Sequence, residues 1–185
     1  MPDPRLFYAC PLPESIVSSL AEGQMRLRRA GWKGRFTERT GWHVTLLFLG
    51  ATAPELLPDL LHAGAAAARA GRPALVHVRG LTTFPSSRQP RVVAAELDDG
   101  GDILAQIRAV LTEYLHVIDD RAFRPHVTLL RVDQADSAPR LPQVTASAAA
   151  RLDQLVLYES TLLPTGARYE ARGVWPLSGA GGADG

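Results

Sequence analysis

A sequence of five residues, His-Val-Thr-Leu-Leu, occurs twice in the chain, at positions 43–47 and again at positions 126–130. Branched and aliphatic residues dominate both copies, and this composition predicts β-strands. Side chains alternate between the two faces of a strand, so the histidine and the threonine of each copy point the same way. Val44 and Val127 then point the opposite way, into a core. Each copy presents an imidazole and a hydroxyl together, and we predict that the two copies are halves of one site.

The other histidines do not share this context. His62 and His116 fall in segments with helical spacing, and His77 alternates with Val76 and Val78 in a predicted strand. A solvent-facing or hydrogen-bonded structural role is the simpler interpretation for all three. The repeat is therefore not a by-product of a chain rich in histidine.

The composition fits an ordinary globular protein. The chain has 185 residues, of which 46% are hydrophobic and 21% are charged, and its formal net charge is +1. This length suits one domain with a substantial core, or two small lobes that share a core. A charge near zero excludes the global basic field of a general nucleic-acid coat. A local basic cluster does exist, at Arg26, Arg28, Arg29, Lys33, Arg35 and Arg39. Two interpretations stay open for it: a solvated helix face with a loop, or a rim that attracts phosphate.

The chain contains one cysteine, Cys10, which excludes an internal disulfide framework. Neither a secretion signal nor an apolar run long enough to span a bilayer is visible, so we expect a cytoplasmic protein with no membrane association. No Cys-His spacing typical of a structural zinc site is present.

Periodicity predicts an α+β fold with two helix-bearing sheets. We expect strands near residues 5–10, 43–49, 74–78, 91–97, 126–132, 152–158 and 169–177. We expect helices from Pro13 to about Gly31, from 54 to 70 and from 102 to 115. The stretch 135–150 is predicted to be a connection with one edge strand, and 31–41 a basic loop. Residues 1–177 are expected to form one bilobal domain, and 178–185 a flexible tail.

Several segments together resemble the RNA 2′,3′-cyclic phosphodiesterase branch of the 2H phosphoesterase superfamily, also called the 2′-5′ RNA ligase family. Besides the two His-x-Thr motifs, these segments are 5–9, 41–50, 84–85, 123–131 and 157–160. The resemblance implies a bilobal fold, in which two antiparallel sheets face each other across a central cleft with helices on the outside. It also implies that the two motif strands oppose each other across that cleft.

The residue types of the two motifs suit the opening of a strained cyclic phosphodiester. Attacking water must lose a proton and the departing ribose oxygen must gain one, and two imidazoles can supply both transfers near neutral pH. The resemblance implies that His43 is the proton donor and His126 the proton acceptor, while Thr45 and Thr128 donate to the phosphate oxygens. We expect no metal and no cofactor. Metal ligation by His43 and His126 is the rival interpretation, but neither motif contains an accompanying carboxylate.

Further substrate contacts are predicted at Phe48, Arg131 and Arg124. Phe48 and Arg131 each lie five residues after a motif histidine, in positions that flank the nucleobase or phosphate in the resembling family. Strict alternation puts such a residue on the opposite face, so this role requires a β-bulge or an exit from the sheet. Core packing is the alternative for Phe48. Trp32 and Trp42 are either stacking platforms for bases or buried packing residues.

The expected function is metal-independent hydrolysis of 2′,3′-cyclic phosphates on RNA or nucleotides to 2′-phosphates, by a monomer. Reversible 2′-5′ joining of tRNA halves would use the same site, so the sequence leaves it open. A non-catalytic RNA-binding module is the alternative from another class. The intact pair of motifs and the nearly neutral charge both argue against such a module.

Overall fold

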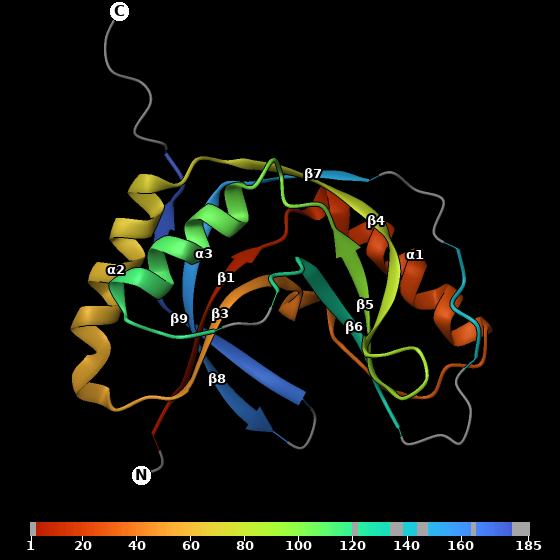
Figure 1. Ribbon diagram of the computed structural model, residues 1–185. Helices are drawn as coiled ribbons and strands as arrows, with labels where there is room; N and C mark the ends of the chain where they lie inside the picture. The colour runs from red at the N-terminus through yellow and green to blue at the C-terminus, as the bar shows by residue number, and fades with distance from the viewer. Residues whose placement is uncertain (1–2, 120–121, 134–138, 144–147, 164–165, 179–185) are drawn as a thin grey trace, which may run out of the picture.

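The computed structural model describes residues 3–119, 122–133, 139–143, 148–163 and 166–178, and its strands form two antiparallel sheets. The first sheet has the strand order β3-β1-β8-β9 and the second has the order β2-β6-β5-β4-β7. The strands are β1 (Arg5–Pro11), β2 (Gly34–Phe36), β3 (His43–Ala51), β4 (Ala74–Pro85), β5 (Pro90–Leu97), β6 (His126–Val132), β7 (Ala149–Leu152), β8 (Gln154–Leu163) and β9 (Gly166–Pro176). The two sheets face each other, with the motif strands β3 and β6 in contact between them (Figure 1). The predicted α+β fold is confirmed.

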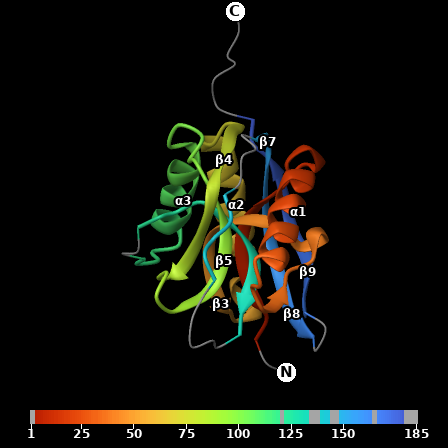
Figure 2. The same cartoon turned by 90° about the vertical axis from the view of Figure 1, so that its right-hand side faces the viewer.

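Helices cover the outer face of each sheet. Helix α1 (Glu14–Arg29) packs against β6 and β7 of the second sheet, whereas α2 (Leu57–Ala70) and α3 (Ile103–Tyr114) pack on the first sheet and on each other. Figure 2 shows α1 and α3 on opposite sides of the molecule. Two single turns of 3₁₀-helix, η1 (Arg39–Gly41) and η2 (Pro54–Leu56), precede β3 and α2.

The charged residues of α1 lie at the ends of the helix where the helix dipole favours them. Glu14 lies in the first turn, and Arg26, Arg28 and Arg29 lie in the last turn. An acidic residue at the amino end and basic residues at the carboxyl end both interact favourably with the helix dipole and so stabilise the helix. Of these arginines, Arg26 donates to the carbonyl oxygen of Gln143 and Arg28 lies over the ring of Phe36, 3.7 Å from its centroid.

The core lies between each sheet and its helices. Val44 and Val127 are completely buried, as the alternation of the repeat predicts. The same hydrophobic core includes Ile16 of α1 and Leu104 and Leu111 of α3. The valines anchor both motif strands and fix which face of each strand is turned towards the other sheet.

The structure differs from the sequence predictions mainly in the connections. The predicted loop 31–41 contains the short strand β2, which pairs with β6. Strand β4 continues to Pro85, beyond the predicted end at 78. Three residues are too few for a periodic signal, and the pairing of β2 depends on a strand nearly a hundred residues away. Of the predicted tail, residues 179–185 lie outside the described residues, as do 135–138 and 144–147 of the predicted connection.

Within the described part of the chain, no helix is both long and apolar enough to cross a membrane.

Candidate active site

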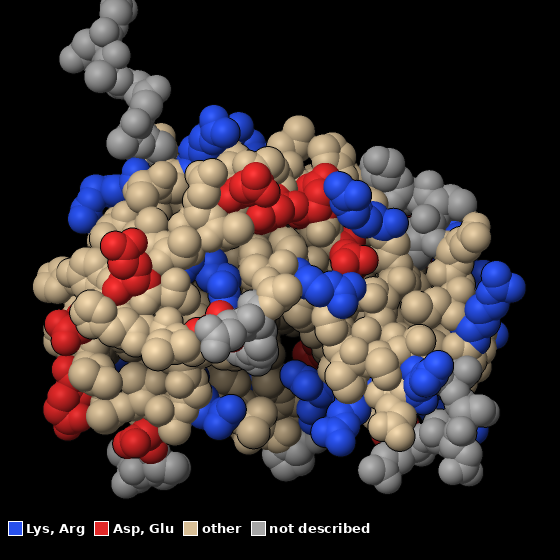
Figure 3. Space-filling view, in the orientation of Figure 1, with Lys and Arg blue, Asp and Glu red and all other residues tan. Residues whose placement is uncertain are grey.

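The two motifs meet in a cleft between the sheets. A cavity of about 980 Å³ is lined by His43 and Thr45 from β3 and by His126 and Thr128 from β6. Both strands begin at their histidine, so the imidazoles lie at equivalent ends of two strands. The space-filling view in Figure 3 shows a hollow in the middle of one face of the molecule, with Lys and Arg side chains around it.

Each motif histidine is held in the same way. Nδ1 of His43 lies 2.7 Å from the carbonyl oxygen of Gly41, and Nδ1 of His126 lies 2.7 Å from that of Arg124. A carbonyl oxygen can only accept, so Nδ1 of each ring carries the hydrogen and donates it. This bond leaves Nε2 as the nitrogen that exchanges protons. The two imidazoles can therefore act as an acid and base pair through equivalent atoms.

A bulge in each motif strand changes its alternation. The pairing of β3 with β1 passes from Thr45 directly to Leu47, and the pairing of β6 with β5 passes from Thr128 directly to Leu130. The extra residue in each case is the first leucine of the motif, and both leucines of each motif are buried. The residue after them returns to the cleft face. Phe48 and Arg131 both line the cleft for this reason.

Aromatic side chains surround His43. Its ring centroid lies 4.9 Å from that of Phe7, 6.0 Å from that of Tyr158 and 5.1 Å from that of Tyr169, which meets it edge-on. The pKa of His43 is lowered to about 4: burial is the largest cause, the hydrogen bond to Gly41 opposes it, and charge repulsion from His126 adds to the lowering. In the free protein His43 is therefore neutral at pH 7.

Among the described residues, His126 has one aromatic neighbour, Phe84, whose ring centroid lies 4.6 Å away. The guanidinium of Arg124 lies 4.8 Å from the centroid of the same ring and is 2.9 Å from a carboxylate oxygen of Glu96. Arg124 itself does not line the cavity. Its connection to the site runs through its carbonyl oxygen, which accepts the hydrogen bond of His126.

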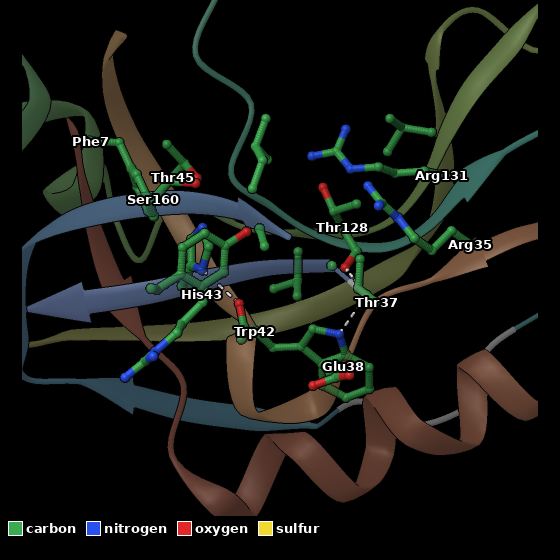
Figure 4. Close-up of a pocket in the computed structure, with 18 of the residues that line it drawn as sticks. Phe7, Arg35, Thr37, Glu38, Trp42, His43, Thr45, Thr128, Arg131 and Ser160 are labelled. Carbon is green, nitrogen blue, oxygen red and sulfur yellow. Dashed lines mark hydrogen bonds between the residues drawn. The ribbon is translucent and has the colours of Figure 1, made fainter. Parts of the chain in front are cut away.

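A chain of hydrogen bonds connects the two halves of the site. Nε1 of Trp42, next to His43, donates to the hydroxyl of Thr37 at 2.8 Å. That hydroxyl donates in turn to the carbonyl oxygen of Thr128 at 2.7 Å. Figure 4 shows Thr37 between Trp42 and Thr128. Trp42 and Trp32 are both buried, which favours packing over base stacking for the two tryptophans.

The bulge in β6 is held in place by additional hydrogen bonds. Nε2 of the buried Gln24 donates to the carbonyl oxygens of Thr37 and Leu129, at 2.9 and 3.0 Å. The backbone N–H of Thr37 also donates to the Leu129 carbonyl. A buried polar group is tolerated where its hydrogen bonds are made. Here one bond holds the bulge of β6, the strand that carries Thr128 and Arg131, and the other holds Thr37 beside it.

The remaining histidines lie away from the cavity. Nδ1 of His77 lies 2.9 Å from a carboxylate oxygen of Asp98, while His62 and His116 are exposed. Sequence reasoning gave no role to several residues that line the cleft, namely Arg5, Phe7, Ser160, Arg168 and Tyr169, and it named Arg35 only as a member of the basic cluster. Their signal was weak because each belongs to a strand without a motif, and only the pairing of the strands brings them to the cleft.

Among the described residues, no three His, Cys, Asp or Glu side chains gather closely enough to hold a metal ion.

The fold and the twin His-Thr site together define a protein of the 2H phosphoesterase type, and comparisons with known proteins agree. The family model described as LigT-like phosphoesterase matches residues 11–94. The RNA 2′,3′-cyclic phosphodiesterase of Thermus thermophilus is 34% identical, over 97% of this chain and 93% of that protein. The RNA 2′,3′-cyclic phosphodiesterase of Methanocaldococcus jannaschii is 28% identical, over 92% of this chain and 99% of that protein.

Solved structures show the same relationship. The crystal structure of TT0787 of Thermus thermophilus superposes with a TM-score of 0.81 and 34% identity, covering 95% of this chain and 99% of that chain. E. coli LigT complexed with ATP has a TM-score of 0.75 and 23% identity, over 96% of this chain and 99% of that chain, which supports the fold. The chain belongs to the LigT-like family of 2H phosphoesterases.

Proposed function

We propose that this protein hydrolyses 2′,3′-cyclic phosphates at RNA ends or on nucleotides and leaves a 2′-phosphate. The observation that carries the proposal is the pair of imidazoles on opposite sheets, each with Nδ1 bonded to a carbonyl oxygen two residues earlier and Nε2 left for proton exchange. The names of the curated relatives support the same substrate class.

The reaction needs one proton acceptor and one proton donor. Nε2 of neutral His126 takes a proton from water as the water oxygen bonds to phosphorus. The bond between phosphorus and the 3′ oxygen breaks, and His43, protonated on Nε2, gives that oxygen a proton. In-line displacement requires the two groups on opposite sides of phosphorus, and the facing sheets provide two such sides. Thr45 and Thr128 donate hydrogen bonds to the non-bridging oxygens as their charge changes.

The environment of His43 adds a requirement to this assignment. Its pKa of about 4 in the free protein means that His43 must gain a proton before it can act as the acid. The negative charge of a bound phosphodiester favours the imidazolium form, so substrate binding itself supplies the shift. We therefore expect proton uptake when substrate binds near neutral pH.

Phe48 and Arg131 complete the proposed contacts with the substrate. Phe48 is 62% exposed although it is a large apolar residue, and its ring centroid lies 5.6 Å from that of the buried Phe7. An exposed aromatic ring on a rigid strand suits stacking against a base. Arg131 supplies positive charge on the other sheet, and Arg124 contributes by orienting His126.

An assay with adenosine 2′,3′-cyclic phosphate tests the proposal. We expect hydrolysis that continues in excess EDTA, because two imidazoles perform both proton transfers, and we expect adenosine 2′-phosphate as the product. Loss of activity on chelation that a divalent ion restores would contradict the metal-independent mechanism. A 3′-phosphate product would contradict the direction of ring opening.

The roles of the two histidines are tested with a substrate whose 3′ oxygen is replaced by sulfur. A thiolate leaves without taking up a proton, so removal of the acid should matter much less with this substrate. We expect His43→Ala to be rescued and His126→Ala not to be. The reverse result would exchange the two roles.

We include a monomeric state and cytoplasmic residence in the proposal. Both sheets of one chain line the cleft, so the site needs no second copy. Cys10 is completely buried, and burial raises the pKa of its thiol to about 12, which makes it unreactive.

Ligation of RNA ends would use the same two histidines in the reverse reaction. Incubation of 2′-5′-linked products with the enzyme measures the equilibrium between cleavage and ligation.

A further inference from the structure

Two arginines lie side by side at the cleft. Arg35 of β2 is the direct cross-strand partner of Arg131 of β6, and both side chains are exposed and line the cavity. Figure 4 shows their guanidinium groups next to each other, on the side of the cleft that carries Thr128. Cross-strand partners have Cβ atoms roughly 5 Å apart, so these two cations are held close together by the backbone.

Neither arginine has a carboxylate partner among the described residues. Other arginines of the chain do: Arg108 pairs with Asp119, Arg124 with Glu96 and Arg172 with Glu159. Like charges on directly opposed residues destabilise a sheet. An anion bound between the two guanidinium groups would remove that repulsion.

The backbone brings these two residues together in a specific way. Gly34 has a φ of +137°, and a Cβ at this position would collide with the carbonyl oxygen of Arg131. Glycine is thus required for β2 to lie against β6 at this point. The bulge at Leu129, held by Gln24, turns Arg131 to the cleft face. A chance surface cluster would not need a close backbone approach and a supported bulge.

The spacing indicates which anion fits. Because Leu129 is the extra residue of the bulge, Arg131 is the next residue after Thr128 that faces the cleft. The two residues are separated by two regular strand steps, about 7 Å along the strand. This distance is of the order of the spacing between neighbouring phosphates in a nucleic-acid strand. The planar fork of arginine suits phosphate oxygens, which can accept two hydrogen bonds from one guanidinium.

We propose that Arg35 and Arg131 bind the phosphate one nucleotide upstream of the 2′,3′-cyclic phosphate. The cleft then selects an RNA 3′ end, or a nucleotide with a 5′-phosphate, over an unphosphorylated nucleoside 2′,3′-cyclic phosphate. This inference rests on the proposed function and adds a residue, Arg35, that sets substrate selection.

The test compares two substrates that differ by one phosphate. Adenosine 2′,3′-cyclic phosphate and its 5′-phosphorylated form are assayed with the wild type and with Arg35→Gln. We expect the wild type to prefer the 5′-phosphorylated substrate in kcat/KM, and Arg35→Gln to reduce that preference about tenfold or more, the scale of a lost hydrogen bond between charged groups.

Two control variants separate a specific site from a general positive field. Arg168→Gln removes an exposed arginine that lines the same cavity from the first sheet, and Arg29→Gln removes one from α1 outside the cavity. Both should retain the preference for the 5′-phosphorylated substrate. An equal reduction in all three variants would overturn the proposal, since it would show a field without a site.

A binding measurement without turnover distinguishes this inference from the proposed function. Calorimetry compares adenosine 2′,5′-bisphosphate with adenosine 2′-monophosphate, and we expect the wild type to prefer the bisphosphate and Arg35→Gln to lose that preference. A preference that depends on Arg35 without any hydrolysis would overturn the proposed function alone. Hydrolysis without such a preference would overturn the phosphate site alone.

Discussion

The two halves of the site share their backbone but not their surroundings. In both, the histidine begins the strand and bonds to the carbonyl oxygen two residues earlier, and a bulge at the first leucine turns the later residue to the cleft. Among the described residues, however, His43 lies between three aromatic rings and has a pKa of about 4, whereas His126 has one aromatic neighbour. The residue that the bulge directs into the cleft is Phe48 in the first half and Arg131 in the second.

This comparison separates two kinds of information. The repeated sequence sets the position of the imidazole and the hydroxyl, because the same local backbone follows from the same residues. The aromatic surroundings differ because Phe7 of β1, Tyr158 of β8 and Tyr169 of β9 pack around His43, whereas Phe84 of β4 packs against His126. A symmetric motif thus acquires asymmetric surroundings through residues distant in sequence.

The largest expected effect tests whether both halves are needed. His43→Ala and His126→Ala should each reduce turnover of a 2′,3′-cyclic nucleotide by at least roughly 10²-fold, the usual scale for a lost general acid or base. Steady-state kinetics measures this, with circular dichroism to verify folding. His62→Ala and His116→Ala are the controls and should retain activity. Near-normal turnover in a folded variant of either motif histidine would refute the two-histidine mechanism.

The second expected effect concerns stability. It involves only the half of the site that contains the buried His43. The folded-state pKa of His43 is about 4 against an ordinary value of 6.5, so between these values the unfolded chain binds a proton that the native state does not. Stability from this group is therefore present above pH 6.5 and is lost as the pH falls towards 4. Between about pH 7.5 and about pH 5 the loss is ~2 kcal/mol in the free energy of unfolding.

Urea unfolding at the two pH values measures this loss. His43→Gln should lose ~2 kcal/mol less than the wild type over the same interval, because the titrating group is gone. His62→Gln, at an exposed histidine, should behave as the wild type does. Identical pH dependence in the wild type and His43→Gln would mean that the aromatic surroundings do not hold His43 neutral.

The smallest expected effect concerns the connection between the halves. Thr37→Val keeps the shape of the side chain but removes the hydroxyl that joins Trp42 to the carbonyl of Thr128. We expect kcat to fall by up to about tenfold with KM nearly unchanged, the scale of one lost hydrogen bond. Thr37→Ser should restore kcat, and Thr161→Val, at an exposed strand position, is the matched control. A fall in thermal stability with an unchanged kcat would restrict Thr37 to a structural role.

The sequence by itself determined the class of fold and predicted the residue pairs of the site. Alternation in the repeat identified His43 with Thr45 as one pair and Val44 as core, because the strand period is a local property. The order of the motif segments identified the family. The doubled leucines also carried a signal for the bulges, since a strictly alternating strand cannot bury Leu46 and Leu47 on one face.

Only the tertiary structure decided which residues surround the two pairs. Strand β2 is too short to be recognised alone, so the pairing of Arg35 with Arg131 could not be predicted. The rings around His43 come from other strands, and a pKa depends on burial and on charges that no local pattern encodes. Sequence periodicity predicts the direction of a side chain in a regular strand, whereas strand pairing sets the bulges and the neighbours, and the asymmetry of this site is a property of neighbours.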